Sequence, residues 1–331
     1  MSTRTRRLTY SLAINEAFHQ TMERDDSVIL IGQGVKSPWY VGNTAKGLID
    51  RFGEQRVIDT PVSENAITGT AVGAALAGMR AVVVHPRMDF MLYAFDPIVN
   101  EAANWCYMNG GKLSVPVVFW GVINRGGEQA AQHSQALHAM FSHVPGLKVV
   151  MPATPYDAKG LMVAAIEDDN PVVFVDDRWL YNTEGNVPET IYSVPIGKGV
   201  VRKEGSDISL IATSFLVGES LKAAAELDRY DIDVEVVDLR TVKPLDVDMI
   251  LKSVKKTGRA AVVDSGWKTC GLAAEVSAVI AEHDIRMLKS PVRRITLPDI
   301  PAPASRSLEK KYYIDASTIV DAALKLIGMN V

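Results

Sequence analysis

The chain has 331 residues, of which 47% are hydrophobic and 22% are charged, and its formal net charge is −4. This composition is typical of a globular α/β protein with a large core, and the length is sufficient for two domains. The small negative charge gives no reason to expect a nucleic-acid or membrane partner. The longest nearly apolar stretch, Ala66–Met79, is too short and too rich in Thr and Gly to span a bilayer.

The cysteines and the N-terminus bear on the compartment. Cys106 and Cys270 are far apart and lack the spacing of zinc ligands, so we expect reduced thiols. The start of the chain contains Arg6 and Arg7, but no apolar segment follows them as it would in an export signal. We therefore expect a cytoplasmic protein.

Strand and helix patterns alternate through the first half of the chain. In chain order we expect a helix over Leu8–Arg24, a strand over Val28–Gly32, a helix over Thr44–Phe52, a helix beginning at Glu64, a strand over Ala81–Val84, a helix over Phe90–Tyr107, a strand over Val115–Gly121, a polar loop over Ile123–Gln135, a strand over Leu147–Met151, a helix capped by Thr154, and a strand over Pro171–Val175. This alternation predicts a parallel sheet that is covered on both faces.

A second α/β unit is predicted after an irregular connection, Asp176–Pro195. Its expected strands are Ile208–Ala212, Val234–Asp238, Ala260–Val263 and Val292–Ile295, and its expected helices are Leu216–Asp228, Asp246–Lys256, Leu272–His283 and Ala316–Leu326. The Pro-rich stretch Leu297–Ser305 is expected to be irregular. The prediction is two parallel-sheet α/β domains, residues 1–185 and 195–331, joined by a linker at 186–194.

The stretch Asp59–Gly78 contains a candidate site. Ser63 is placed to cap a helix in which Glu64 takes the first position, and the residues that follow are almost all small or apolar. We therefore expect a buried helix with Glu64 at its mouth, where the helix dipole favours the charge of the carboxylate and desolvation opposes it. Glu64 either complements the dipole only or serves catalysis. No basic residue follows before Arg80, so Glu64 has no partner on its own helix.

Three histidines, His133, His138 and His143, lie in the segment AAQHSQALHAMFSH. Glu128 is the only acid nearby, so the segment is a poor candidate for a zinc site. His133 has polar neighbours and follows a Gly-rich loop, which suits contact with a ligand, whereas His143 equally suits a structural hydrogen bond in a turn. No Gly-x-Gly-x-x-Gly follows a strand, and the chain has no Walker motif.

Several segments resemble one family along nearly the whole chain. They are DTPVSEN (Asp59–Asn65), FDPIVNEAA (Phe95–Ala103), AAQHSQ (Ala130–Gln135), PGLKVVMPATPYDAKGL (Pro145–Leu161), VEVVDLRTVKPLD (Val234–Asp246) and TGRAAVVDSGW (Thr257–Trp267). The family is the β subunit of the first component of thiamine-diphosphate-dependent 2-oxo acid dehydrogenases of the pyruvate, branched-chain or acetoin type. The resemblance implies a transketolase-like pyrimidine-binding domain followed by a transketolase C-terminal domain.

The resemblance assigns roles to individual residues. Thiamine diphosphate reacts as a thiazolium carbanion, which its own 4′-amino group generates after a carboxyl group at the pyrimidine nitrogen has promoted the imino tautomer. Ser63 and Glu64 match the family's pair at this position, and a single acid in a dry site suits that role. Phe90 matches the aromatic residue that stacks on the aminopyrimidine, with a core aromatic as the alternative. His133 matches the histidine that faces the substrate and assists transfer to the acceptor.

The family binds the diphosphate and Mg²⁺ through a Gly-Asp-Gly motif, which this chain lacks. The resemblance therefore implies a second polypeptide, the α subunit, which holds most of the Mg²⁺ and diphosphate contacts in an α2β2 heterotetramer. Asp168 and Asn170 match a turn where some members hold a structural K⁺, although an acidic turn is also commonplace.

The sequence departs from the family around the aromatic position, which reads Val84-His85-Pro86-Arg87-Met88-Asp89-Phe90, and in the loop that contains Arg125. Arg87 and Arg125 are either surface charges or contacts for an anionic or polyhydroxylated substrate. Three hypotheses follow. The first is 2-oxo acid decarboxylation with transfer to the lipoyl group of an acyltransferase partner. The second is a carboligase or transketolase-like enzyme with an aldehyde, ketone or sugar as acceptor. The third is an inactive assembly scaffold, against which the intact Glu64 and His133 argue.

Overall fold

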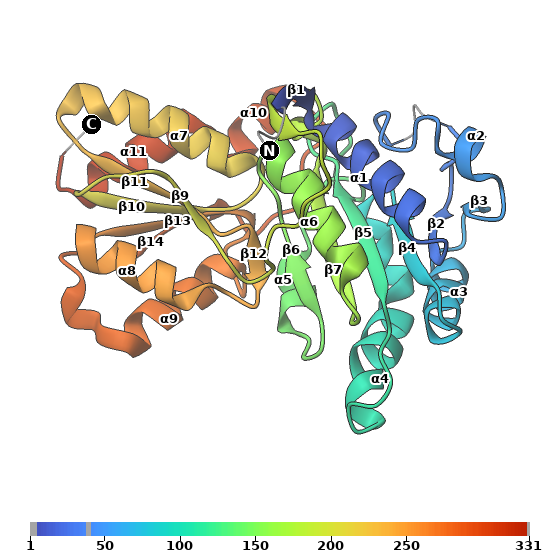
Figure 1. Ribbon diagram of the computed structural model, residues 1–331. Helices are drawn as coiled ribbons and strands as arrows, with labels where there is room; N and C mark the ends of the chain where they lie inside the picture. Colours follow the sequence, from blue (N-terminus) through green and yellow to red (C-terminus); the bar gives the residue numbers. More distant parts are fainter. Residues whose placement is uncertain (1–4, 38–40, 330–331) are drawn as a thin grey trace. The chain divides into compact units, whose positions relative to one another are not determined.

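The computed structural model describes residues 5–37 and 41–329, and within these it contains two compact units (Figure 1). The first unit comprises the described parts of Met1–Arg125 together with Met140–Ile196. The second comprises Gly126–Ala139 and the described part of Gly197–Val331. Each unit is built around its own sheet. No helix in the described ranges has the length and apolar character needed to cross a bilayer.

The first unit contains a parallel sheet whose strands are almost completely buried, apart from the one at an edge that carries Asp59. In spatial order its strands are β6 (Lys148–Val150), β7 (Val172–Asp177), β5 (Val117–Ile123), β4 (Arg80–His85), β2 (Val28–Gly32) and β3 (Val57–Asp59). Continuous apolar runs such as VVFWGVI in β5 are needed because helices cover both faces of such a sheet. The predicted parallel α/β architecture is confirmed.

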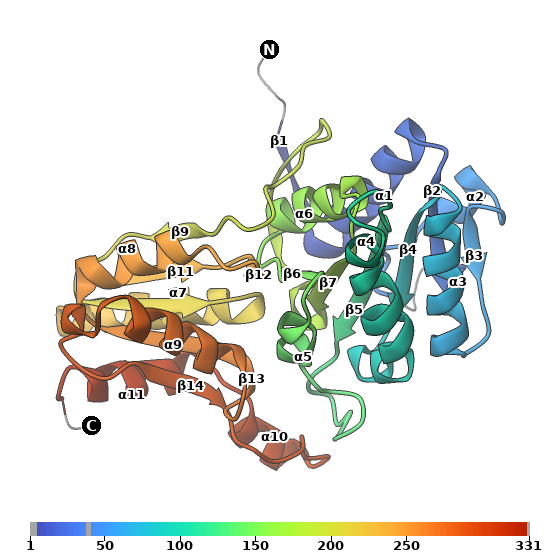
Figure 2. The same ribbon diagram turned by 90° about the horizontal axis from the view of Figure 1, so that it is seen from below.

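Helices lie on both faces of this sheet (Figures 1 and 2). On one face α1 (Tyr10–Arg24) packs against α6 (Pro155–Glu167), and on the other lie α3 (Glu64–Leu76) and α4 (Ala103–Met108). The predicted cap of α6 is confirmed, since the Thr154 side chain accepts a hydrogen bond from the backbone N–H of Asp157. A short helix, α2 (Leu48–Phe52), follows β2, and α5 (His138–His143) follows β5.

The continuous helix expected over Phe90–Tyr107 is wrong. The chain forms a 3-10 helix, η1 (Met88–Ala94), then a π-helical segment, η2 (Pro97–Ala102), and only then the α-helical turns of α4. Pro97 accounts for the interruption, because proline has no N–H to donate and its ring clashes with the preceding turn of an α-helix.

Within the segment expected as a linker, residues 186–188 belong to a strand. Strand β8 (Glu184–Pro188) pairs antiparallel with β1 (Thr5–Thr9). The buried Lys159 of α6 holds this region, because its Nζ lies 2.5 Å from Glu16 Oε1 and donates to the carbonyls of Pro188 and Thr190 at 2.8 and 3.0 Å.

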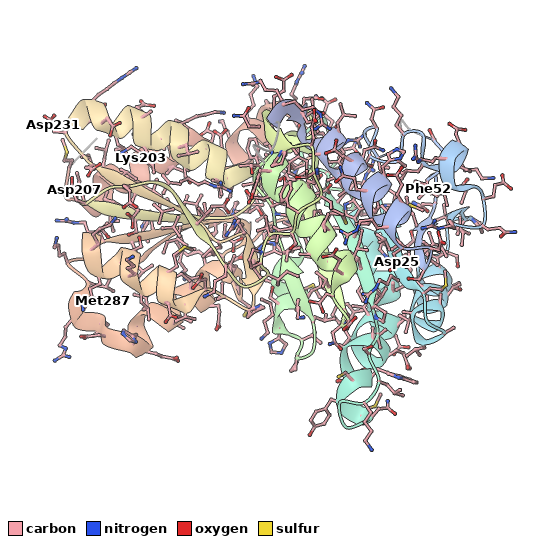
Figure 3. The ribbon with its side chains drawn as sticks, viewed as in Figure 1. Asp25, Phe52, Lys203, Asp207, Asp231 and Met287 are labelled. Carbon is pink, nitrogen blue, oxygen red and sulfur yellow. The ribbon has the colours of Figure 1, made fainter. Side chains whose placement is uncertain are left out.

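The second unit contains a sheet in the order β14 (Arg293–Leu297), β13 (Ala260–Trp267), β10 (Ile208–Ala212), β11 (Val234–Asp238) and β9 (Val200–Lys203). All neighbours are parallel except β9, which pairs antiparallel with β11. Lys203 on this edge strand lies 3.3 Å from Asp233 (Figure 3 labels Lys203), and an edge charge of this kind discourages pairing with another chain.

Helices α7 (Phe215–Leu227) and α11 (Ala316–Leu326) pack together on one face of the second sheet, and α8 (Val247–Thr257) and α9 (Leu272–Asp284) on the other (Figure 1). The bounds of β10, β11 and α11 agree with the predicted ones. Residues 298–304 form no helix or strand, as expected, and the short helix α10 (Arg306–Tyr312) follows them. The short elements η3 (Arg178–Leu180), η4 (Asp228–Tyr230), β12 (Thr241–Lys243) and η5 (Ile285–Met287) complete the connections.

Candidate active site

Most of the predicted site residues of the first unit follow the carboxyl ends of its parallel strands. Ser63 and Glu64 follow β3, Arg87 and Phe90 follow β4, and Arg125 follows β5. Because parallel strands end at the same edge of a sheet, the topology brings these segments together at the edge where ligands of open α/β sheets bind.

Glu64 begins α3, as predicted. Ser63 occupies the N-cap position, but its side chain makes no capping hydrogen bond. The Glu64 side chain is half-buried, and within the described residues it has no hydrogen-bond or ion-pair partner. The N-terminus of a helix favours a negative charge, so the carboxylate is stabilised there without being used by a neighbour.

The expectation that α3 is a buried helix is wrong for this chain by itself. One face is buried, at Ile67, Thr68, Ala71, Val72 and Ala75. The opposite face is exposed, at Ala66, Gly69, Thr70, Gly73 and Ala77. Small residues make such a face narrow and weakly apolar, so the sequence pattern alone does not distinguish burial within the chain from exposure.

His85 connects β4 to the helix that carries Glu64. Its Nε2 lies 3.2 Å from the Thr68 hydroxyl, and both side chains are buried. Burial lowers the pKa of His85 to about 4, so the imidazole is neutral near pH 7. One residue after Glu64, the Asn65 side chain donates to the carbonyl of Tyr93 at 3.2 Å, which ties the start of α3 to η1.

Phe90 and Arg87 lie at the start of η1. Phe90 is half-buried, an exposure that suits either a ring facing a ligand or a core aromatic. Arg87 takes the N-cap position of η1, and its Nη1 donates to the carbonyl of Pro86 at 3.0 Å. The structure thus brings Glu64 and Phe90 onto adjoining elements of the same unit, because α3 packs against η1.

The interpretation of Arg125 as a surface charge is wrong, because the residue is buried. Its side chain is 2% exposed and forms an ion pair with Asp177, whose side chain is 0% exposed. The guanidinium also lies over the Trp179 ring, 5.3 Å from its centroid. Burying a charge requires a partner of opposite sign, and Asp177 at the end of β7 supplies it.

Asp176 is a buried acid that the sequence analysis missed. The pKa of its carboxyl is raised to about 8, chiefly by burial and also by the charge of Asp177, while the polar groups of Trp120 and Tyr181 and the charge of Arg178 act in the opposite direction. Asp176 is therefore mostly protonated at neutral pH, beside an Asp177 whose charge Arg125 compensates. The Asp-Asp pair ending the apolar run VVFVDD was the available signal.

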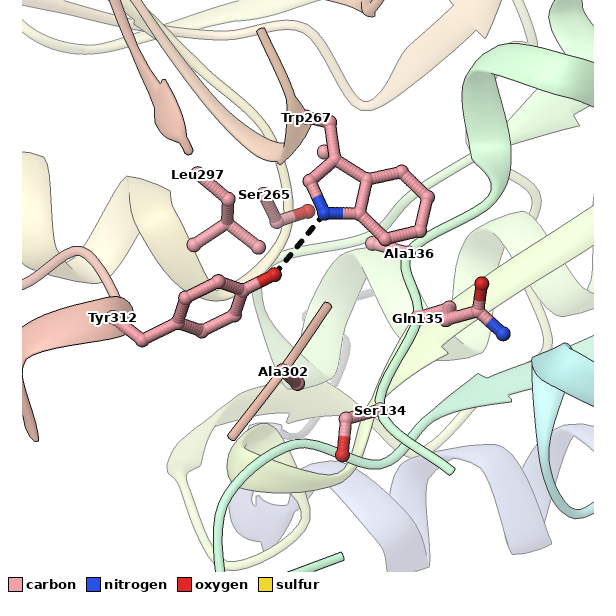
Figure 4. Close-up of a pocket in the computed structure, with 9 residues that line it drawn as sticks. Ser134, Gln135, Ala136, Ser265, Trp267, Leu297, Ala302 and Tyr312 are labelled. Carbon is pink, nitrogen blue, oxygen red and sulfur yellow. Dashed lines mark hydrogen bonds between the residues drawn. The ribbon is translucent and has the colours of Figure 1, made fainter. Parts of the chain in front are cut away.

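The loop that carries His133 belongs to the second unit, whereas Glu64 and Phe90 belong to the first. The His133 side chain is half-buried, and His143 is exposed. Figure 4 shows Ser134 and Gln135 of this loop lining a small pocket with Trp267 and Tyr312, and the Trp267 indole donates to the Tyr312 hydroxyl at 3.1 Å.

His138 is buried and pairs with an acid of β13. Its Nε2 lies 2.9 Å from Asp264 Oδ1, and both side chains are 0% exposed. Burial by itself would raise the pKa of Asp264, but the charge and hydrogen bond of His138, with backbone N–H groups of Gly266 and Ala273, lower it below the ordinary value. The sequence pattern identified His138 as a candidate residue but did not indicate Asp264 as its partner.

In the turn that contains Asp168 and Asn170, the oxygens of Asp168 already have cationic partners, whereas the buried Oδ1 of Asn170 accepts no hydrogen bond from a described residue. The Asp168 carboxylate accepts from Lys148 Nζ at 2.5 Å and from the backbone N–H of Asn170 at 2.9 Å. Arg80 donates to the carbonyls of Ile166 and Asp168, both at 3.1 Å. Over the described parts of the chain, no group of three or more His, Cys, Asp or Glu side chains is arranged to hold a metal ion.

Family models match both units. The transketolase pyrimidine-binding domain matches residues 6–184, and the transketolase C-terminal domain matches residues 197–319. In the solved structures, a chain described as a split-gene transketolase, inactive β4 tetramer, superposes with a TM-score of 0.80 over 98% of this chain and 99% of that one, at 21% identity. That likeness concerns the fold.

Curated relatives match almost end to end. The β subunit of acetoin:2,6-dichlorophenolindophenol oxidoreductase from Cupriavidus necator is 44% identical over 97% of this chain and 97% of its own length. The pyruvate dehydrogenase E1 component subunit beta of Rickettsia felis is 41% identical over 98% of this chain and 99% of its own length. The chain therefore belongs to the transketolase-like family of β subunits of the first component of thiamine-diphosphate-dependent 2-oxo acid dehydrogenases.

Proposed function

We propose that this chain is the β subunit of an enzyme that decarboxylates a 2-oxo acid and transfers the acyl group to a lipoyl group. The observation that supports this proposal most directly is Glu64, a half-buried carboxylate at the start of α3 that no described residue engages. A carboxylate in that setting is available to a ligand, and it matches the acid that the family uses.

The residues of the chain fit the aminopyrimidine of thiamine diphosphate. When bound, the cofactor supplies the nucleophilic carbon and the electron sink for decarboxylation. Glu64 would hold a proton at the pyrimidine ring nitrogen, and Phe90 on the adjoining η1 would flank the ring. His85 would add no positive charge to this region, since its pKa of about 4 leaves the imidazole neutral. His133 would handle a proton at the acceptor, which suits an imidazole.

The proposal includes a second polypeptide. Because the chain has no Gly-Asp-Gly motif, an α subunit would hold the diphosphate and Mg²⁺, and the complete enzyme would be an α2β2 heterotetramer working with a lipoyl acyltransferase. A K⁺ at Asp168 and Asn170 is part of the proposal, although it would share the carbonyl of Asp168 with Arg80. We also propose a cytoplasmic location, which the free Cys106 and Cys270 support.

The alternative is a carboligase or transketolase-like enzyme that transfers the activated group to a carbonyl compound. Arg87 and Arg125 are the residues that would favour it. Since Asp177 compensates the charge of Arg125, this alternative depends on Arg87. Arg87 follows β4 at the same edge as Glu64 and would contact an anionic or polyhydroxylated acceptor.

The test is to co-express the chain with an α subunit that carries the Gly-Asp-Gly motif. Release of CO₂ from pyruvate and branched-chain 2-oxo acids, and release of acetaldehyde from acetoin, are measured with thiamine diphosphate and Mg²⁺, with and without lipoamide. Turnover that depends on lipoamide supports the proposal. Turnover that ignores lipoamide but consumes an added aldehyde or keto-sugar supports the alternative, and absence of thiamine-dependent turnover with any partner contradicts both.

Variants of Glu64 connect the activity to the proposed residue. Glu64→Gln keeps the shape but cannot hold the proton, and we expect a loss of at least about 100-fold in kcat, as for removal of a positioned general acid. Glu226→Gln, at an exposed position of α7, is the matched control and should keep full activity. Retention of activity in Glu64→Gln would favour the scaffold hypothesis.

A further inference from the structure

The loop that carries His133 contains strained backbone. Glu128 and Ala130 have φ angles of 63° and 58°, in the left-handed region that residues with a side chain rarely adopt. Such conformations persist where the surrounding structure over-determines them, and they concentrate at functional sites. The loop therefore needs contacts that hold it.

The first contacts come from α10 and the residue after it. Glu309 is 6% exposed, and its Oε1 accepts a hydrogen bond from the backbone N–H of Glu128 at 2.9 Å. The hydroxyl of Tyr313 accepts from the backbone N–H of Gly126 at 3.3 Å. A carboxylate that accepts from a backbone N–H forms a charge-assisted hydrogen bond, so Glu309 stabilises the strained conformation at Glu128 more than a neutral acceptor would.

The second contact lies at the other end of the loop. His138 and Asp264 are fully buried and 2.9 Å apart, and Asp264 is itself fixed by the backbone N–H groups of Gly266 at 2.9 Å and Ala273 at 3.2 Å. Asp264 lies on β13, an interior strand of the second sheet, so the pair fastens the end of the loop to a rigid strand.

We propose that Glu309 and the His138–Asp264 pair are positioning residues that fix the loop on both sides of His133. His133 lies midway in sequence between Glu128 and His138, the two points at which the loop is held. This inference rests on the proposed role of His133 in transfer to the lipoyl group. It goes beyond that role because it assigns the placement of the histidine to the second unit, through residues that touch neither substrate nor cofactor.

The test uses the reconstituted α/β complex and two acceptors. Acylation of a lipoyl domain needs His133, whereas reduction of an artificial dye, 2,6-dichlorophenolindophenol, takes electrons without an acyl acceptor in place. We expect Glu309→Ala to lower lipoyl-domain acylation by about 10-fold or more while dye reduction changes by less than about threefold. Glu309→Gln retains an oxygen that can accept from Glu128 and should recover most of the acylation.

A double-mutant comparison separates positioning from a general structural effect. If Glu309 acts through His133, Glu309→Ala should change acylation by less than about twofold when His133→Ala is already present. An equal loss in both backgrounds, an equal loss with both acceptors, or no loss at all would overturn the inference. Glu282→Ala, on the exposed side of α9, is the control and should leave both rates unchanged.

The other end of the loop is tested in the same way. His138→Gln retains a donor toward Asp264 and should keep more acylation than His138→Ala, with the same dependence on His133. His283→Ala, at an exposed position of α9, is the matched control. If these or the Glu309 variants fail to assemble, Tyr313→Phe removes one hydroxyl only, and its expected loss of acylation of about threefold must likewise vanish in the His133→Ala background.

A measurement without activity separates this inference from the proposed function. Hydrogen exchange of the backbone amides of residues 126–138 reports how often the loop opens locally. In the full chain alone, we expect Glu309→Ala and Tyr313→Phe to raise the rate of this exchange by about fivefold or more relative to Glu282→Ala. An unchanged rate overturns the inference even if the complex is active. A raised rate with a complex that shows no thiamine-dependent turnover contradicts the proposed function but supports the inference that Glu309 and Tyr313 hold the loop.

Discussion

Replacing Asp176 with Asn should change how the stability of the protein depends on pH. Asp176 is fully buried, and burial raises its pKa to about 8 from the ordinary value of 3.8. At pH 6 the folded protein therefore holds a proton that the unfolded chain has lost. Asn is close in shape to the protonated acid and carries no titrating proton, so Asp176→Asn removes this contribution while leaving the packing around Trp120 and Tyr181 nearly intact.

The magnitude follows from proton linkage. A carboxyl whose pKa is raised in the folded state contributes stability below its unfolded pKa, and this contribution is lost as the pH rises through the folded pKa. Between about pH 6 and about pH 9, the loss amounts to about 3 kcal/mol in the free energy of unfolding. We therefore expect the wild type to lose about 3 kcal/mol more stability over this interval than the Asp176→Asn variant.

The assay is urea denaturation of both proteins at the two pH values, with the free energy of unfolding extrapolated to water. The neighbouring Asp177 is present in both proteins, and its interaction with Asp176 is part of the difference that is measured. Asp321→Asn, at an exposed position of α11, is the control and should follow the wild type. A difference between wild type and Asp176→Asn that stays constant from pH 6 to pH 9 would refute a protonated Asp176.

Three further predictions concern other parts of the first unit. His85 has a pKa of about 4 in the folded protein and 6.5 as its ordinary value, so the unfolded chain takes up a proton first and the wild type loses stability as the pH falls from 7 to 5. Gln does not titrate, so the destabilisation caused by His85→Gln should be smaller at pH 5 than at pH 7 by about 2 kcal/mol. Urea denaturation of both proteins at both pH values measures this difference. Lys159→Ala should destabilise by about 2–4 kcal/mol in urea denaturation, since the carbonyls of Pro188 and Thr190 lose their buried donor while Glu16 keeps its ion pair with Arg6. If K⁺ binds at Asp168, replacing K⁺ by choline should lower the melting temperature of the wild type but not of Asp168→Ala; identical shifts in the two proteins would exclude that site.

The sequence pattern was sufficient for the elements whose periodicity is strong. Strands β10 and β11 and helix α11 were predicted to the residue, because each is a clear apolar run or amphipathic repeat between polar turns. The irregular segment before α4 was not predictable in the same way. Its residues are suited to a helix, and the departure depends on a single proline.

For the candidate site, the residue pattern indicated chemical types but not their surroundings. The start of α3 at Glu64 was predicted, whereas the exposure of one face of that helix was not, since small residues fit both surface and interior. The partners of Arg125 and His138 lie 52 and 126 residues away in sequence, and pairings over such distances come from the fold. The proposed roles of Ser63, Glu64, Phe90 and His133, and the domain limits, stay predictions.

The path of the chain between the two units has a consequence for dissecting or exchanging them. The chain passes from the first unit to the second at residue 126, returns at 140, and passes over again at 197. A fragment that begins at residue 197 would therefore lack the 126–139 segment, and it would leave Glu309 without Glu128 and Asp264 without His138. Swapping the C-terminal half between related subunits would likewise pair a foreign α10 and β13 with the host's loop. Recombination in this family is thus expected to succeed only when the loop travels with the C-terminal half.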